Sequence, residues 1–315
     1  MKQNLLLRYI IKRLLMLIPV ILGVVFIVFF ILSISPNDPA ANILGEYASK
    51  DEIISFRSKY GLDKPFIFQY LNFLKGLVTF NLGESFRGNV KVFDEIILRF
   101  PATLTLTIIS MIVAVIIAIP AGIISAAKQY SAFDNISMVT ALLGISIPNF
   151  WLGLMLILFF SVKLQWLPSI YQMGNLRSYI MPAIVLGTAL SASTARMTRS
   201  SMLEVIRQDY ITTARSKGLP EKTVILKHAL KNALIPIITV VGLQFAGMLG
   251  GSAITEKVFA WPGLGSRIID AQNDFDIPLI LGGVVYIAIV ISVVNLIVDL
   301  LYAVVDPKIR SRYKG

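Results

Sequence analysis

The chain has 315 residues, of which 56% are hydrophobic and only 15% are charged. Soluble domains usually carry about 45–50% apolar and about 25% charged residues, so this excess would leave large apolar patches in water unless lipid covered them. The absence of cysteine excludes a disulfide-stapled secreted scaffold and thiolate chemistry.

Six apolar runs without charges are long enough to cross a bilayer as helices. A crossing helix takes roughly 20 apolar residues, because in lipid every backbone amide must be hydrogen-bonded within the segment. The fourth run is short and contains Gly187 and several hydroxyl side chains, so we expect it to face protein or water. The sequence predicts an all-α polytopic membrane protein with six transmembrane helices. The six runs are 14–34, 102–127, 135–162, 178–195, 232–255 and 277–298.

The first run follows four basic residues and therefore resembles a secretory signal peptide. Its apolar stretch exceeds the usual signal-peptide core of about 7–15 residues. We expect it to be an uncleaved first span. The basic residues that precede it are Lys2, Arg8, Lys12 and Arg13.

Basic residues concentrate on one side of the predicted bundle. Segment 196–231, between the fourth and fifth runs, has eight basic and three acidic residues, whereas segment 35–101 has eight of each. The positive-inside rule then places the N-terminus, segment 196–231 and the C-terminus in the cytoplasm. A basic patch that binds nucleic acid is the alternative, and the flanking spans argue against it.

Segment 35–101 is too long to be a simple connector between spans. Residues 51–60 read as a short helix that ends at Gly61, and residues 66–77 read as an amphipathic helix at the membrane interface. The segment could cap the bundle or form a docking surface for an external partner. These two interpretations are compatible.

A second external segment, 256–277, contains a turn that suits the membrane surface. Proline fixes one backbone dihedral and glycine permits a positive φ, so we expect a tight turn with its tryptophan at the membrane interface. The turn residues are Trp261, Pro262, Gly263 and Gly265.

Segment 199–231 is too polar for lipid and too periodic to be disordered, so we expect a helix, a turn and a second helix on the cytoplasmic surface. Met202, Val205 and Ile206 form one apolar face, and Gly218 ends the first helix beside a protruding Leu219. Such a rigid basic projection is well shaped to enter a groove on another protein. The simpler alternative is a solvated basic loop.

The same segment resembles the EAA loop of binding-protein-dependent ABC importers, in particular the permeases for dipeptides, oligopeptides and nickel. The matching strings are DYITTARSKGLP at 209–220 and HALKNALIP at 228–236. Thr212 and Thr213 depart from the general loop pattern, and the closing proline comes late, as is usual in this branch. Further strings at 8–14, 35–40, 60–65, 81–85, 99–103 and 255–265 are similar to the first of the two paired permease subunits.

The resemblance implies a type I importer permease of the bacterial cytoplasmic membrane that is not itself an enzyme. Its partners would be a sister permease, two ATP-binding subunits and an external solute-binding protein. No phosphate-binding loop or metal-ligand spacing occurs in the chain, so ATP and Mg²⁺ are expected on the partner subunits and no cofactor on this one. The expected ATPase-coupling residues are Thr212, Thr213, Ala214, Arg215, Ser216, Lys217, Gly218 and Leu219.

Several polar side chains lie within the predicted spans and are candidates for the translocation path. Polar groups in a span tend to face protein or water, and hydrogen bonding between helices is the alternative role for each of them. Gly247 and Gly251 form a pair that is typical of close helix packing. The candidates for the path are Asn149, Gln244, Ser252 and Asn295, with Thr103, Thr105 and Thr107 as further polar positions.

We therefore expect three parts: residues 1–34 with the first span, the external segment 35–101, and a core permease domain at 102–315. The predicted function is uptake of dipeptides or oligopeptides, coupled to ATP hydrolysis by the partners. Import of nickel, metal chelates or glutathione remains open. A proton-coupled secondary carrier is the alternative from another class, although it would usually need acidic residues within its spans.

Overall fold

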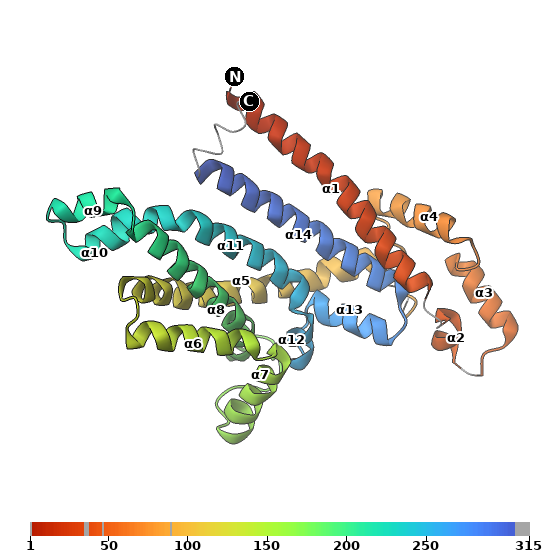
Figure 1. The fold of residues 1–315 in the computed structure, drawn as a ribbon. Coiled ribbons are helices and arrows are strands. Elements are labelled where there is room, and N and C mark those ends of the chain that lie inside the picture. Colours follow the sequence, from red (N-terminus) through yellow and green to blue (C-terminus); the bar gives the residue numbers. More distant parts are fainter. Residues whose placement is uncertain (1, 35–37, 46, 89, 306–315) are drawn as a thin grey trace. The chain divides into compact units, whose positions relative to one another are not determined.

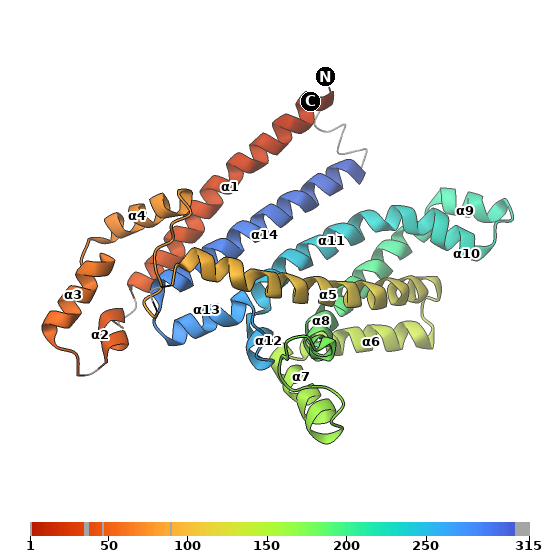
Figure 2. The same cartoon turned by 180° about the vertical axis from the view of Figure 1, so that it is seen from behind.

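The computed structural model describes residues 2–34, 38–45, 47–88 and 90–305 (Figures 1 and 2). The basic tail from residue 306 onward, predicted to be cytoplasmic, lies outside these residues. Helices make up nearly all the regular structure of the described part, which confirms the all-α prediction. The longest are α1 (Lys2–Ser33), α5 (Val92–Ala127), α6 (Ala132–Ser146), α8 (Ile180–Ile206), α11 (Leu230–Gly251) and α14 (Ile277–Val305).

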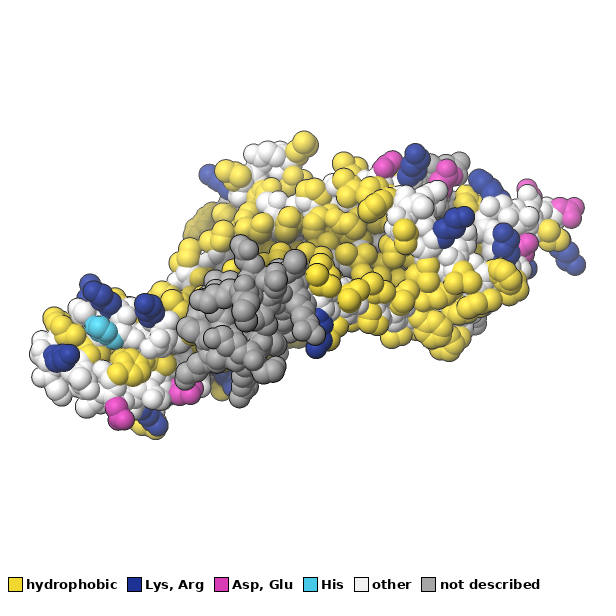
Figure 3. Space-filling model, turned by 90° about the horizontal axis from the view of Figure 1, so that it is seen from above, with side chains coloured by type: hydrophobic (Ala, Val, Ile, Leu, Met, Phe, Trp, Pro, Cys, Tyr) yellow, Lys and Arg dark blue, Asp and Glu magenta, His cyan; other side chains and the backbone are white. Residues whose placement is uncertain are grey.

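Five helices of the described residues are long and apolar enough to cross a membrane. A sixth span is formed only if two bent helices, α6 and α7 (Asn149–Leu156) with its π-helical extension Ile157–Lys163, are counted together. Large apolar side chains cover much of the face in Figure 3, as lipid contact requires. The five single spans are Leu14–Ser33, Val92–Ala127, Leu176–Ile206, Glu221–Gly251 and Ile277–Leu301.

The third predicted run, 135–162, is not the straight helix that we expected. The chain bends by 100° between Ser146 and Asn149. Ile147 is extended, with φ −79° and ψ 123°, and Pro148 follows it. Proline lacks an amide hydrogen and disfavours a helical conformation in the preceding residue, so one helix ends here and another begins in a new direction.

The chain divides into two compact units. The first comprises Met1–Thr103 and Pro262–Val290, and the second comprises Leu104–Trp261 and Ile291–Gly315. This division differs from the three parts drawn from the sequence, because residues near the end of the chain pack with the external segment.

The first unit contains the predicted short helices. The α3 helix (Lys50–Tyr60) begins with a capping box between Ser49 and Glu52 and ends at Gly61, whose φ is 67°. The α4 helix (Phe66–Val78) packs on α1, where Tyr70 donates a hydrogen bond to the Leu22 carbonyl. Both predicted helices are present. The other short helices of this unit are α2 (Pro39–Leu44) and α13 (Leu264–Asn273).

A buried carboxylate anchors the loop before α5. Asp276, which is fully buried, accepts hydrogen bonds from the Ser85 hydroxyl and from the Phe86 amide. The apolar core beside it contains Leu82, Val92 and Leu279. The external segment is thus held to the first turn of α14.

In the second unit, α8 packs against both α6 and α11. Gly122 in α5 allows a close approach to α8, since an added Cβ would lie 2.7 Å from the Ala195 carbonyl oxygen. More of the α8 span is buried within the chain than of any other candidate span. This agrees with the expectation that the fourth run faces protein or water rather than lipid.

Candidate functional site

The predicted cytoplasmic segment forms the helical hairpin that its sequence pattern predicts. The α9 helix (Asp209–Ser216) is followed by a turn at Gly218 and by α10 (Glu221–Thr223), which continues as the π-helix Val224–Ala229 into α11. Gly218 has a φ of 76°, a left-handed conformation that glycine adopts without strain. This part of the chain stands out at one end of α8 and α11 in Figures 1 and 2.

An apolar core holds the hairpin to the ends of α8 and α11. Ile211 and Ala214 of α9 are buried against Met202, Val224 and Ile225. At three residues apart, the two α9 side chains lie on one face of the helix. The base of the hairpin is therefore packed, and the opposite face of α9 is left to solvent.

Seven of the eight predicted coupling residues are exposed, and the eighth is not. Ala214 is buried in the core below α9, so its role is to pack the hairpin rather than to touch a partner. The hydroxyls of Thr213 and Ser216 donate to the carbonyls of Asp209 and Thr212 in the preceding turn of the same helix. The exposed residues are Thr212, Thr213, Arg215, Ser216, Lys217, Gly218 and Leu219.

Arg215 braces the Gly218 turn from within the chain. Its Nε and Nη2 donate hydrogen bonds to the two carboxylate oxygens of Glu221 at 3.1 and 2.8 Å. The hydrogen bonds to Glu221 and its negative charge raise the pKa of Arg215 above the usual value, so the guanidinium stays charged. Both described hydrogen bonds of the Arg215 guanidinium go to Glu221 within the chain. Lys217 has no described ion pair and remains available.

Two of the predicted translocation residues make side-chain hydrogen bonds to other residues of the chain. Gln244 in α11 accepts a hydrogen bond from Thr194 of α8 at 2.9 Å, and buried Ser252 donates one to Glu256 at 2.9 Å. Both fit the alternative role of joining helices or turns. Asn149 lies at the first position of α7, directly after the bend, and is half-buried.

Asn295 in α14 differs from these, because its amide oxygen is buried without a hydrogen-bond partner among the described residues. Of the threonines, Thr103 is buried and accepts a hydrogen bond from the Leu264 amide, Thr107 is buried, and Thr105 is exposed. Gly247 and Gly251 have no atom within 4 Å of an added Cβ, so they make no close helix contact within the described chain.

The external turn has a different geometry from the one expected. Trp261 is only 1% exposed, and its ring packs edge-on against Tyr171 and Tyr179 with centroids 4.7 and 4.6 Å away. It is therefore a core residue and not a surface anchor. The positive φ belongs to Ala260, at 47°, whereas Gly263 caps α13 in an extended conformation and Gly265 lies inside that helix. Nothing in the sequence pattern indicates this burial, because Tyr171 and Tyr179 lie far from Trp261 along the chain.

Sequence reasoning missed an ion pair that joins α6 to α8. Arg199 in α8, counted there only as part of the basic segment, donates hydrogen bonds from Nε and Nη2 to Asp134 of α6. Asp134 is buried and accepts a hydrogen bond from the Tyr130 amide, and it lies in the first turn of α6, after the N-cap Ser131. A Ser-x-x-Asp pattern at a helix start was the available local signal.

Comparison with known families gives the class of protein. The model of the binding-protein-dependent transport system inner membrane component matches residues 118–311, which is more than half of the chain. A model of the N-terminal region of the same kind of membrane component matches residues 6–107. The chain belongs to this family. This permease is therefore a multi-pass membrane transport subunit and not an enzyme. Permeases of this family work in general with a sister permease, ATPases and a binding protein.

Curated relatives match the permease over almost its full length. It is 44% identical to the dipeptide transport system permease protein of Alkalihalophilus pseudofirmus, over 96% of this chain and 99% of the relative. It is 42% identical to the oligopeptide transport system permease protein of Bacillus subtilis, over 96% and 98%. It is 44% identical to the glutathione transport system permease protein of Escherichia coli K12, over 97% and 100%.

The fold also has a solved counterpart. An inward-facing structure of the MetNI methionine ABC transporter aligns with 67% of the permease and 96% of its own chain, with a TM-score of 0.56 and 20% sequence identity. At this level of identity the likeness concerns the fold alone. It confirms the predicted type I importer architecture.

Proposed function

We propose that this permease forms half of the translocation path of an ABC importer for dipeptides or oligopeptides in the bacterial cytoplasmic membrane. It is the first of two different permease subunits, paired with a sister chain and served by two ATP-binding subunits and an external binding protein. ATP and Mg²⁺ act on the ATP-binding subunits, and this chain holds no cofactor. Both termini lie in the cytoplasm, as the excess of basic residues there favours.

The observation that carries the proposal is the exposed tip of the α9–α10 hairpin. Its core is packed by Ile211 and Ala214, its turn is braced by Arg215 and Glu221, and Leu219 is 37% exposed beside Gly218. A packed and braced hairpin of this kind can transmit the movement of a bound partner, because it moves as one rigid unit. Closure of the ATP-binding subunits would then move α8 and α11, which continue from the hairpin, between two states.

A cross-linking experiment tests this contact directly. Because the chain contains no cysteine, Leu219→Cys supplies a single site for a thiol-reactive photo-cross-linker in the assembled transporter. We expect cross-links to an ATP-binding subunit. The control is Tyr47→Cys, a fully exposed position in the external segment, which should not reach that subunit. Reaction of Leu219→Cys with an impermeant thiol reagent from outside intact cells would contradict the proposed orientation.

The substrate requires a separate measurement. The dipeptide and oligopeptide permease relatives support a peptide substrate for this permease. The glutathione permease relative makes glutathione, a tripeptide, the second candidate. The complete transporter, reconstituted with its binding protein, should hydrolyse ATP faster when the preferred solute is added. Stimulation by nickel alone, with none by peptides or glutathione, would contradict peptide transport.

A further inference from the structure

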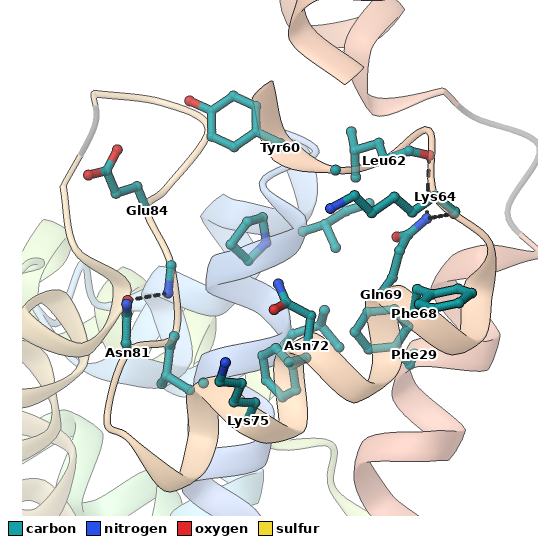
Figure 4. Close-up of a pocket in the computed structure, with 18 of the residues that line it drawn as sticks. Phe29, Tyr60, Leu62, Lys64, Phe68, Gln69, Asn72, Lys75, Asn81 and Glu84 are labelled. Atoms are coloured by element: carbon teal, nitrogen blue, oxygen red, sulfur yellow. Dashed lines mark hydrogen bonds between the residues drawn. The ribbon is translucent and has the colours of Figure 1, made fainter. Parts of the chain in front are cut away.

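An open cavity of about 580 Å³ lies within the first unit and has no role in the proposed coupling. Its walls are the turn after α3, one face of α4, the loop 81–86 and the first turns of α14, with Phe29 of α1 at one side (Figure 4). A cavity of this size is in the range that small ligands occupy.

The cavity lies beside the ends of two candidate membrane spans. Phe29 is one turn from the end of the candidate span Leu14–Ser33, and Ile277 and Pro278 begin the candidate span Ile277–Leu301. The first span ends and the last begins at this level, so two separate stretches of the chain give the same depth. Phospholipid headgroups occupy this zone.

Two cations and an amide converge on the cavity. In Figure 4, Lys64 and Lys75 reach into the space from different sides and Asn72 lies between them, whereas the carboxylate of Glu84 points away. Neither lysine has a described ion pair. Gln69 is already engaged, because its amide donates to the carbonyls of Leu62 and Lys64 at 3.3 and 2.7 Å and fixes the turn that carries Lys64. Two cationic side chains without a described counter-charge, beside an amide that can donate hydrogen bonds, favour an anionic ligand.

An apolar surface continues from the charged part of the cavity. Phe68 lines the cavity and is 61% exposed, and Ile67 and Leu71 of the same helix are more than half exposed. Phe29 and Phe73 extend the apolar wall on the side of α1. A free inorganic anion would leave this surface in contact with water, whereas an amphiphile with an anionic head and acyl chains would cover it.

We propose that this cavity binds the phosphodiester headgroup of an anionic phospholipid, held by Lys64, Lys75 and Asn72, with its acyl chains along the exposed face of α4. The lipid fastens the external helices to the ends of α1 and α14. The stability of the transporter then depends on the anionic lipid content of the membrane, whichever solute it carries.

The test uses the complete transporter in nanodiscs of phosphatidylcholine, with or without one quarter phosphatidylglycerol. Native mass spectrometry and thermal melting are compared for the wild type, for Lys64→Gln/Lys75→Gln and for Lys50→Gln/Lys91→Gln. The last variant loses the same charge from the same segment, at positions that do not line the cavity.

We expect phosphatidylglycerol to be retained by the wild type and to raise its melting temperature. Since each lysine near an anionic membrane is worth roughly a fivefold change in binding, the cavity variant should retain it at least about tenfold less well. The control variant should match the wild type. Equal retention and equal melting of the cavity and control variants would overturn the proposal. An equal effect of glycerol phosphate in pure phosphatidylcholine would also overturn it, because the site would then bind a soluble anion.

Discussion

Asp134 at the start of α6 accepts two hydrogen bonds from Arg199 in α8, at 2.6 Å from Nε and 2.7 Å from Nη2. The carboxylate side chain is 1% exposed and the arginine side chain 23%. A paired charge of this kind holds two helices in one relative position, because separating them would leave a buried carboxylate without its partner.

Replacing Asp134 with alanine should therefore be costly. Removing one partner of a buried ion pair typically destabilises a protein by about 3–5 kcal/mol, and we expect about 3 kcal/mol here because Arg199 is partly exposed. Thermal melting of the purified transporter measures the change. The control is Arg57→Ala, which breaks the exposed pair with Asp38 and should cost under about 1 kcal/mol. Equal losses for the two variants would argue against a special role of the buried pair.

Substitutions at Gly218 should separate conformation from bulk. No atom lies within 4 Å of an added Cβ, so Gly218→Ala adds no steric clash. Its cost comes from forcing alanine into a φ of 76°, which should destabilise the fold by about 1–2 kcal/mol. Gly218→Asn should be milder, since asparagine tolerates this conformation. Gly218→Trp should abolish uptake, because the ring would obstruct the tip of the hairpin.

The measurements for these three variants are solute uptake and the amount of permease in the membrane. Uptake should fall in the order asparagine, alanine, tryptophan, while membrane insertion stays at the wild-type level. Normal transport by Gly218→Trp would refute the coupling role of the hairpin.

A methyl group at Gly122 should disturb the contact of α5 with α8. The added Cβ would lie 2.7 Å from the Ala195 carbonyl oxygen and 2.5 Å from the Thr198 Cβ, and overpacking of this kind typically costs about 1–3 kcal/mol. The matched control is Gly23→Ala in α1, where no atom lies within 4 Å of the new carbon. Gly122→Ala should lower the melting temperature and Gly23→Ala should not; the reverse order would contradict the close helix contact.

Trp261 should contribute both to the stability of the fold and to the tryptophan fluorescence of the protein. Truncating a buried tryptophan to alanine costs about 3–5 kcal/mol, and Trp261→Phe should cost less because it keeps an aromatic ring between the tyrosines. Of the three tryptophans, Trp151 and Trp166 are exposed in the chain and Trp261 is buried. Tryptophan fluorescence after Trp261→Phe should lose intensity, and an unchanged melting temperature for Trp261→Ala would contradict its place in the core.

Local patterns were reliable where one stretch of chain settles its own structure. The apolar runs, the helix before Gly61, the amphipathic helix at 66–77 and the break at Gly218 all depend on neighbours within a few residues. The bend in the third run was equally local, since Pro148 interrupts it, but its uncharged length concealed the break. Packing groups the chain into two units that differ from the three predicted parts, because it joins segments that are far apart in the sequence.

The amino-acid pattern alone was enough to establish a membrane-spanning helical protein with a basic hairpin between its fourth and fifth spans, because length and hydropathy govern insertion whatever the packing. Packing settled which side chains meet: Ala214 turns inward, Arg215 grips Glu221, and Trp261 inserts between two tyrosines. The Asp134 pair with Arg199 joins residues 65 positions apart. Such contacts arise when separate helices dock, and no periodicity within one helix specifies them.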